Sequence, residues 1–464
     1  MNDGVQAPAI ERSALRSIIF ASSLGTLFEW YDFYLYGTLA IFFGELFFPP
    51  GNERAALLAS LATFGAGFGV RPLGAIVFGR IGDLVGRKYT FLVTLLTMGL
   101  STALIGFLPT YATIGFMAPV LLVVLRLIQG LALGGEYGGA ATYVAEHVPD
   151  ARRGYYTSFI QTTATLGFFL SLGVIGLTRW YYGPEDFKSF GWRIPFLASF
   201  VLLGVSLYIR LKMNESPLFA KLKSEGKISK NPLKESFGNA RNLKFVMLAL
   251  FGATAGQGVV WYTGQFYALT FLQKPLNLAW PLAYGLTAAA LALGTPLFIV
   301  FGHLSDRHGR KPIMLAGCAL AALTYVPIYV AIQRLANPTM AATVTELSAG
   351  AMLGIVLLLA VQMVYVAMVY GPIAAFLVEL FPTSIRYTSM SLPYHLGNGW
   401  FGGFLPLIAT AVTTSAWATE TFGAGAIFTG LIYPIAVCIL SVVVSALFIR
   451  ETKDHRIDTP IGGD

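Results

Sequence analysis

The chain contains 464 residues, of which 56% are hydrophobic and 12% are charged, and its mean hydropathy is +0.67. So few polar residues cannot cover a water-soluble particle of this size, and the composition therefore excludes a soluble globular protein. The net charge of +8 and the isoelectric point near 9.3 would suit a nucleic-acid-binding protein. However, the basic residues gather mainly on one side of the predicted membrane, as they do in membrane proteins. We therefore expect no nucleic-acid partner.

Apolar segments follow one another along the chain with short polar breaks between them. A membrane-spanning helix needs roughly 20 apolar residues. Twelve segments of about this length can be drawn, at 16–43, 56–79, 90–109, 114–145, 156–180, 192–211, 243–272, 280–301, 312–333, 346–377, 388–413 and 424–449. We therefore predict an all-α integral membrane protein with twelve transmembrane helices. The first segment is far longer than the apolar core of a signal peptide, so we expect it to be retained.

A polar segment divides these twelve stretches into two sets of six. It switches abruptly to Lys, Ser, Glu and Asn, and it contains Pro217 and Pro232. The linker either lies along the membrane surface, with its lysines near anionic lipid, or forms a solvated tether. We predict an N-terminal six-helix bundle, a linker, a C-terminal six-helix bundle and a short tail, at 1–211, 212–242, 243–450 and 451–464.

The basic residues are distributed unevenly between the two sides of the predicted membrane. If the N-terminus is cytoplasmic, 23 of the 31 lysines and arginines fall on the cytoplasmic side and six on the opposite side, while Arg71 and Arg126 remain inside helices. The positive-inside rule therefore places both termini and the linker in the cytoplasm. We expect a multi-pass protein of a bacterial inner membrane, with the lipid bilayer as its surroundings and a functional monomer.

Two short patterns occur once in each half, each at the end of an apolar stretch. The segment Gly79–Lys88 (GRIGDLVGRK) returns in altered form as Gly302–Lys311 (GHLSDRHGRK). A second set, Glu146, Pro149 and Arg153, recurs with identical spacing as Glu379, Pro382 and Arg386. Such a duplication indicates two copies of one membrane unit and points to a transporter.

Several motifs resemble those of the major facilitator superfamily, and within it the metabolite:proton symporters that include the α-ketoglutarate, citrate, shikimate and proline/betaine permeases. These motifs are Phe28–Phe33 (FEWYDF), Arg71–Gly74 (RPLG), Arg126–Gly130 (RLIQG), Gly134–Gly139 (GGEYGG), Trp192–Phe196 (WRIPF), Glu215–Phe219 (ESPLF) and Val378–Thr383 (VELFPT) with Arg386 and Tyr387. The resemblance implies two pseudo-symmetric six-helix bundles around a central cavity. It also implies proton-coupled import of a small organic solute by alternating access, and not an enzyme.

The repeated loops are suited to act as a cytoplasmic latch that holds one conformational state. Glycines allow close helix approach, Asp83 can accept hydrogen bonds from a helix end, and the basic residues can pair with acids. The resemblance implies that Glu146 pairs with Arg152 or Arg153. The alternative is that these are ordinary basic loops. The predicted latch comprises Gly79, Asp83, Gly86, Arg87, Lys88, Glu146, Arg153, Asp306, Arg310, Glu379 and Arg386.

Ionisable residues within the predicted helices indicate functional positions more specifically than the loops do. Each such residue costs several kcal/mol in the bilayer unless it faces a partner or a polar cavity. Glu29 and Asp32 lie three residues apart on one helix, and adjacent carboxylates out of water favour proton uptake. Arg126 should either pair with one of these carboxylates or meet the substrate. A purely structural salt bridge is the alternative. We predict Glu29, Asp32 and Glu136 as proton-coupling candidates, although Glu136 lies roughly 15 Å along the helix from Arg126 and could instead tie helices together.

The predicted seventh helix, at 243–272, is unusually polar and rich in glycine, as expected of a helix that bends and lines a cavity. His395 could titrate near physiological pH, or it could be neutral and hydrogen-bonded. Arg71 could contact a carboxylate of the substrate or bond to a helix end. The predicted substrate-binding residues are Arg126, Arg71, Tyr31, Gln129, Gln257, Trp261, Tyr262, Gln265, Tyr365, His395 and Asn398.

These patterns favour a proton-coupled symporter that imports a small organic solute, with a carboxylate (a di- or tricarboxylate, a shikimate-like acid or an aromatic acid) as the first choice. A zwitterionic osmolyte such as proline or betaine is the alternative substrate, and a non-transporting membrane sensor or scaffold is the alternative class. Cys318 and Cys438 both lie in apolar segments, and the sequence predicts neither a metal site nor a cofactor.

Overall fold

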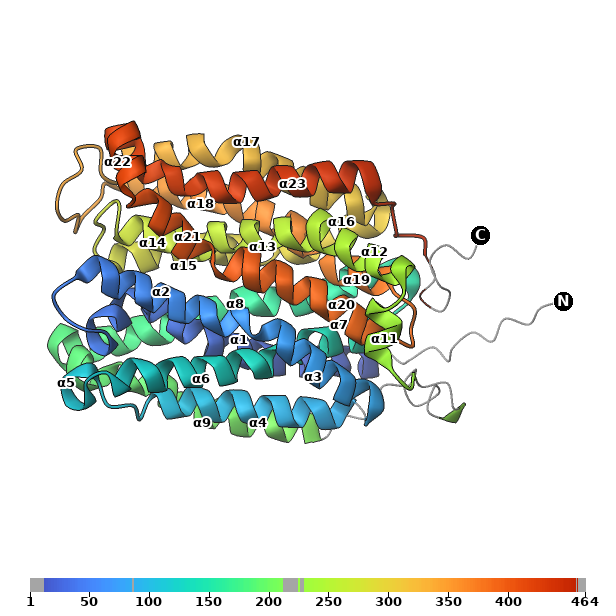
Figure 1. The fold of residues 1–464 in the computed structure, drawn as a ribbon. Coiled ribbons are helices and arrows are strands. Elements are labelled where there is room, and N and C mark those ends of the chain that lie inside the picture. Colours follow the sequence, from blue (N-terminus) through green and yellow to red (C-terminus); the bar gives the residue numbers. More distant parts are fainter. Residues whose placement is uncertain (1–11, 86, 212–223, 226–228, 456, 458–464) are drawn as a thin grey trace.

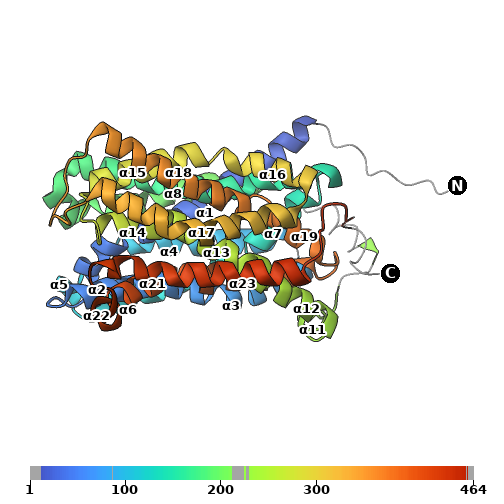
Figure 2. The same cartoon turned by 90° about the horizontal axis from the view of Figure 1, so that it is seen from above.

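The computed structural model describes residues 12–85, 87–211, 224–225, 229–455 and 457. This part of the chain is almost entirely helical, and its helices run side by side along one common direction (Figure 1). The described residues nearest to both chain ends lie at the same end of the molecule as α11 (Pro232–Phe237), and a second direction of view agrees (Figure 2). We call this the linker end, and the opposite end, with α5 and α22, the far end.

The helices follow the predicted segments in order. The first half contains α1 (Arg12–Phe47), α2 (Glu53–Gly69), α3 (Arg71–Leu84), α4 (Arg87–Ile105), α5 (Tyr111–Ile114), α6 (Met117–Gly134), α7 (Tyr137–Ala145), α8 (Arg153–Asp186) and α9 (Arg193–Leu211). The second half contains α12 (Ala240–Ala249), α13 (Ala255–Tyr262), α14 (Ala268–Gln273), α15 (Trp280–Gly294), α16 (Leu297–His308), α17 (Arg310–Ala336), α18 (Ala349–Tyr370), α19 (Ile373–Leu380), α20 (Arg386–His395), α21 (Leu405–Thr413), α22 (Ala416–Phe422) and α23 (Ile432–Phe448).

Twelve membrane crossings can be traced through the described residues. Eight helical stretches are long and apolar enough to cross a membrane by length and composition. Helices α1, α4, α9 and the α20–α21 pair occupy the other four predicted positions. The predicted all-α, twelve-helix architecture therefore agrees with the structure, although α1 extends a few residues beyond each end of the predicted 16–43.

Several of the crossings are interrupted where the sequence disfavours a regular helix. The α2–α3 break falls at Val70, just before Pro72, which lacks an amide hydrogen and fits the first turn of a new helix. The α6–α7 break falls at Gly135 and Glu136. In the seventh and eleventh crossings, wide π-helical turns occupy Leu250–Thr254, Thr263–Tyr267 and Leu396–Gly403. Such turns are frequent at functional sites because they re-aim side chains.

Glycines let α6 approach α2 and α3 unusually closely. A Cβ atom on Gly130 would lie 1.8 Å from the carbonyl oxygen of Gly67, and one on Gly134 would lie 2.2 Å from the carbonyl oxygen of Arg71. Any side chain at these positions would push the helices apart. This contact fixes the positions of Arg71 on α3 and Arg126 on α6 relative to each other.

The described part of the linker is docked rather than free. Ser236 of α11 is buried, and its hydroxyl lies 2.9 Å from that of Ser389 on α20. Asn231 caps α11 by accepting from the Lys234 amide. The solvated-tether alternative therefore does not hold for α11. Residues 212–223 and 226–228 of the predicted linker lie outside the described residues.

Candidate functional site

Two buried arginines share one aromatic side chain in the interior. Arg71 and Arg126 are both fully inaccessible to solvent. The guanidinium carbon of Arg71 lies 4.3 Å from the centre of the Phe33 ring, and that of Arg126 lies 4.2 Å from the same ring. Phe68 also lies 3.9 Å from the Arg71 guanidinium. Cation–π contacts of this kind contribute up to about 2 kcal/mol each when desolvated.

These two cations lack counter-ions among the described residues. None of the three side-chain nitrogens of Arg71 makes a hydrogen bond, and neither do Nε and Nη2 of Arg126. Arg126 Nη1 donates to Gln129 Oε1 at 2.8 Å and to the Phe33 carbonyl oxygen at 3.3 Å. Because burying an unpaired ion costs several kcal/mol even after relaxation, the aromatic contacts do not offset the desolvation. The arrangement can therefore accommodate an anion between or beside the arginines.

The predicted pairing of Arg126 with a carboxylate of α1 is not present in the structure. Asp32 instead accepts a hydrogen bond from Ser199 Oγ of α9 at 2.5 Å. Glu29 contacts Arg210 Nη2, also on α9. Both carboxylates therefore contact α9, whereas the residues that α1 presents to Arg126 are Phe33 and Tyr36. Of the two alternatives for Arg126, the structure does not show the pair with a carboxylate, and contact with substrate stays a prediction.

Arg210 joins two of the three predicted proton-coupling residues. Its Nη2 atom contacts both Glu29 Oε1 and Glu136 Oε1, and all three side chains are buried. Two carboxylates on one guanidinium leave an excess of one negative charge when both are ionised. Sequence reasoning missed Arg210 because it lies in the last turn of its helix, where a basic residue is ordinary.

Aromatic side chains from both halves close around the arginines. Tyr34 stacks on Trp261 with ring centres 5.3 Å apart, and Phe68 meets Tyr262 at 5.1 Å. Nearer the linker end, Tyr137 stacks on Tyr394 at 3.4 Å. All of these residues are buried. The two halves are therefore in direct contact in the interior, and the arginines are occluded from both sides.

Amide side chains from the predicted substrate set also lie between helices. Gln257 and Asn398 form a reciprocal pair, with Nε2 donating at 3.1 Å and Nδ2 donating at 2.7 Å. Gln265 Nε2 donates to Thr165 Oγ1 of the opposite half at 3.4 Å. Gln129, beside Arg126, donates to Thr102 Oγ1 at 2.7 Å. These groups can exchange their present partners for polar groups of a solute.

The remaining predicted substrate residues are placed differently. Tyr31 donates its hydroxyl to the Pro195 carbonyl oxygen at 2.9 Å, and Tyr365 accepts from Thr324 Oγ1 at 2.9 Å. These bonds hold each tyrosine against a helix of its own half, so the structure does not bring either one to the arginines. His395 is buried, and its ring nitrogens make no hydrogen bond of normal geometry.

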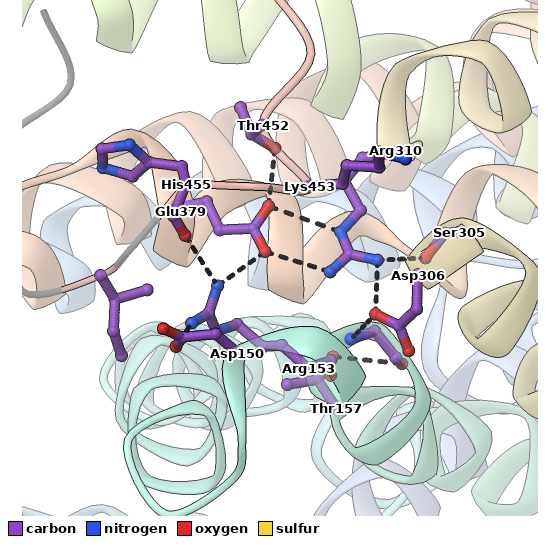
Figure 3. Close-up of polar contacts among 12 residues, drawn as sticks. Asp150, Arg153, Thr157, Ser305, Asp306, Arg310, Glu379, Thr452, Lys453 and His455 are labelled. Atoms are coloured by element: carbon purple, nitrogen blue, oxygen red, sulfur yellow. Dashed lines mark hydrogen bonds and ion pairs between the residues drawn. The ribbon is translucent and has the colours of Figure 1, made fainter. Parts of the chain in front are cut away.

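An ion-pair network joins the two halves at the linker end (Figure 3). Arg153 of α8 binds Glu379 of α19 at 2.8 Å, and Arg310 of α17 binds the same carboxylate at 3.1 Å. Asp306 of α16 accepts hydrogen bonds from the amides of Gly154 and Tyr155, both at 2.8 Å. The Arg153–Glu379 and Asp306 contacts cross between the halves, so they hold the linker end closed until the halves separate there.

The pairing within the latch differs from the expectation that Glu146 binds Arg152 or Arg153. Glu146 instead contacts Arg386 across the halves at 3.5 Å. Arg153 contacts Glu379 and its neighbour Asp150. Gly79 packs against Tyr387, and a Cβ atom added to this glycine would lie 3.4 Å from the tyrosine ring. Gly86 and the side chains of Asp83, Arg87 and Lys88 lie outside the described residues.

The segment after α23 packs against the latch and contributes to it (Figure 3). Thr452 Oγ1 donates to Glu379 Oε2 at 2.6 Å, and Arg153 Nη1 donates to the His455 carbonyl oxygen at 3.5 Å. Glu451 caps α17 by accepting from the amides of Arg310 and Lys311 at 2.8 and 3.0 Å. The sequence indicated only a short tail, because no local pattern signals these distant contacts.

We expect Glu379→Gln to open the linker end. The neutral amide would leave the buried Arg153 and Arg310 without their shared counter-ion, and breaking a buried pair costs about 3–5 kcal/mol. Spin labels at Arg152→Cys and Arg307→Cys, both exposed and on opposite halves, should report a longer distance population than in the parent. Glu45→Gln, which breaks an exposed pair with Lys188, serves as the control. An unchanged distance distribution in Glu379→Gln would contradict a latch.

Comparisons with known proteins agree with this architecture. A family model described as Major Facilitator Superfamily matches residues 22–392. The chain is 38% identical to the inner membrane metabolite transport protein YhjE of Escherichia coli, covering 88% of this chain and 89% of that protein. It is 32% identical to the alpha-ketoglutarate permease (96% and 96%) and 33% identical to the shikimate transporter (95% and 96%) of the same organism. The solved structure of the proton:xylose symporter XylE matches with a TM-score of 0.74 at 20% identity, covering 97% and 98% of the two chains.

Proposed function

This chain belongs to the Major Facilitator Superfamily, and within this membership we propose that it is a proton-coupled symporter that imports an organic carboxylate by alternating access. Membership confirms the predicted family and the twelve-helix fold, and it makes the chain a metabolite transporter rather than an enzyme. The substrate class, the proton coupling, the orientation and a functional monomer are the parts that we propose.

One observation supports a carboxylate as the class of substrate. Arg71 and Arg126 are buried, share the Phe33 ring and have no carboxylate partner among the described residues. A bound carboxylate would supply the missing counter-ion and accept charge-assisted hydrogen bonds, which are roughly twice as strong as neutral ones. Relatives named for α-ketoglutarate and shikimate, both carboxylic acids, support this assignment. A zwitterion such as betaine also has one carboxylate, but its positive charge would lie close to the two arginine cations. Such a solute therefore fits the arginines less well than a carboxylate without a positive charge.

The carboxylates of the first half are suited to carry the proton. Asp32 is buried, and its contact is the Ser199 hydroxyl rather than a cation. Glu29 and Glu136 share one arginine, so one of them can hold a proton without leaving Arg210 unpaired. Proton binding at either place would change the charge in the interior of the first half by one unit. This supports coupling between proton and anion binding.

The closed linker end indicates which state of the transport cycle this structure represents. The excess of basic residues at the linker end supports a cytoplasmic position for this end. With the latch closed there, the structure corresponds to a state that has not released solute to the cytoplasm. Opening requires loss of the Arg153–Glu379 and Arg386–Glu146 contacts, as the two halves rock around the arginines.

The test is flux in liposomes with an imposed inward proton gradient. Labelled 2-oxoglutarate, citrate, shikimate, benzoate, proline and betaine would be offered separately. We expect one carboxylic acid to accumulate above its external concentration and an uncoupler to abolish this accumulation. Accumulation of proline or betaine alone would overturn the carboxylate assignment, and accumulation that survives the uncoupler would overturn proton coupling. Uptake of none would favour a sensor or scaffold.

A further inference from the structure

A cavity of about 730 Å³ lies at the far end, between the two halves. The first half lines it with the N-terminal turns of α2, including Arg54 and Leu57. The second half lines it with the end of the seventh crossing, including Lys274, and with α21, including Thr413. No latch residue lies among its walls. The cavity is therefore at the end of the molecule that the ion-pair network leaves unsealed.

Its walls combine positive charge with apolar surface. Arg54 and Lys274 come from opposite halves, and neither forms an ion pair with another described residue. Glu53 is the one acidic side chain among the described lining residues, so the charge of the walls is net positive. Leu57, Phe271 and other apolar side chains supply most of the remaining surface. This combination suits an anion with an apolar body.

Two buried hydroxyls mark one wall of the cavity. Tyr267 and Thr413 both line it, and their hydroxyl groups interact with each other. Both oxygens lie beside Gly430, within 2.6 Å of the position that a Cβ there would take. This wall therefore presents two adjacent hydroxyl groups beside the otherwise apolar lining.

The helices that line this cavity continue to the arginines. On α2, Phe64 follows Leu57 by two helical turns, about 10 Å, and Phe64 contacts Phe33 at 5.8 Å between ring centres. On the seventh crossing, Phe266 is adjacent to Tyr267 and packs on Phe64 at 5.3 Å. Phe64 also lies 5.5 Å from the Arg126 guanidinium carbon, so this aromatic layer connects the cavity walls to the buried arginines.

We infer that this cavity is a second, outer binding site for an organic carboxylate with an apolar body. The carboxylate lies between Arg54 and Lys274, and its carbon skeleton lies against Leu57 and Phe271. The anion binds here before the aromatic layer parts and admits it to Arg71 and Arg126. The inference rests on the proposed function, and its test is chosen so that the two can fail separately.

The test measures binding at the outer site directly. Thr419, which is exposed and lines the cavity, is replaced by Cys and labelled with an environment-sensitive fluorophore. Benzoate is then titrated against the purified protein, with acetate as the probe that lacks an apolar body. We expect a saturable signal with benzoate, at least tenfold weaker apparent affinity with acetate, and a benzoate signal that persists when Arg71 and Arg126 are both changed to Gln.

The deciding variant is Arg54→Gln combined with Lys274→Gln. We expect at least a tenfold loss of apparent benzoate affinity, with no change in Lys188→Gln, whose side chain pairs with Glu45 outside this cavity. High salt should weaken the parent signal because both cations are exposed. Three results would overturn the outer site. The benzoate signal could be unchanged in the Arg54→Gln, Lys274→Gln variant, or it could disappear in the Arg71→Gln, Arg126→Gln variant. The fluorophore could also respond to added detergent but not to benzoate. None of these outcomes depends on transport.

Discussion

Replacing Arg71 with Gln is expected to lower the affinity for the transported carboxylate about a hundredfold while raising the melting temperature of the unliganded protein. The loss of affinity follows because two or more charge-assisted hydrogen bonds to the carboxylate disappear, each contributing about 1.5–3 kcal/mol. The gain in stability follows because a guanidinium with three unsatisfied nitrogens no longer has to be buried. Equilibrium binding and thermal unfolding of the same preparations measure the two effects.

Opposite signs in these measurements separate a binding role from a structural one. Arg193 is the matched control because its Nη1 atom donates to the carbonyl oxygens of Gly106 and Leu108 at 2.9 and 2.6 Å. Arg193→Gln should lower the melting temperature and leave affinity within about twofold. If Arg71→Gln also destabilises the protein and leaves affinity intact, Arg71 belongs to the scaffold. Arg126→Lys should weaken binding as well, since lysine cannot offer a planar pair of donors.

Replacing Asp32 with Asn is expected to abolish proton-driven accumulation and to spare exchange of labelled for unlabelled substrate. An amide can keep a hydrogen bond to Ser199 but cannot take up or release a proton. Exchange needs only substrate binding and alternation between the two states, so it should proceed at a rate within severalfold of the parent. Counterflow and gradient-driven uptake in the same liposomes measure the two activities.

The same comparison applies to the pair of glutamates on Arg210. Glu29→Gln removes the excess negative charge while Glu136 still pairs with the arginine. If Asp32 carries the proton, Glu29→Gln should retain accumulation; if the glutamates carry it, Glu29→Gln should lose accumulation and Asp32→Asn should keep it. Ser199→Ala is the control, because it removes a bond to Asp32 without removing a titratable group. Survival of accumulation in both carboxylate variants would show that neither residue couples the proton.

The sequence was sufficient for those features that depend on neighbouring residues along the chain. Apolar length predicts each crossing, and the Gly130 and Gly134 spacing predicts a close helix contact, because both follow from local geometry. The partner of a buried charge depends instead on which helix faces it. Pairing of Glu29 or Asp32 with Arg126 was one of two predicted alternatives, but both carboxylates contact α9, and α1 presents Phe33 and Tyr36 to the arginine.

Pairings across the halves were harder still to predict. Glu146 and Arg153 lie seven residues apart in sequence, so a local pair was the natural expectation. The folded chain instead brings Arg386 to Glu146 and Glu379 to Arg153. The duplication carried this information in principle, because each half supplies one acid and one base of the same motif. An exchange of partners between the two copies satisfies both motifs at once.

The contacts of Thr452 and His455 with the latch also bear on how the protein should be handled. A purification tag or fluorescent reporter fused shortly after residue 457 would lie close to the His455 carbonyl oxygen, which loses its bond to Arg153 when the halves separate. Its bulk would bias the equilibrium between the closed and open states. Reporters for conformational measurements therefore belong on exposed positions away from this segment, and cleaved and uncleaved preparations carrying a carboxyl-terminal tag are not interchangeable.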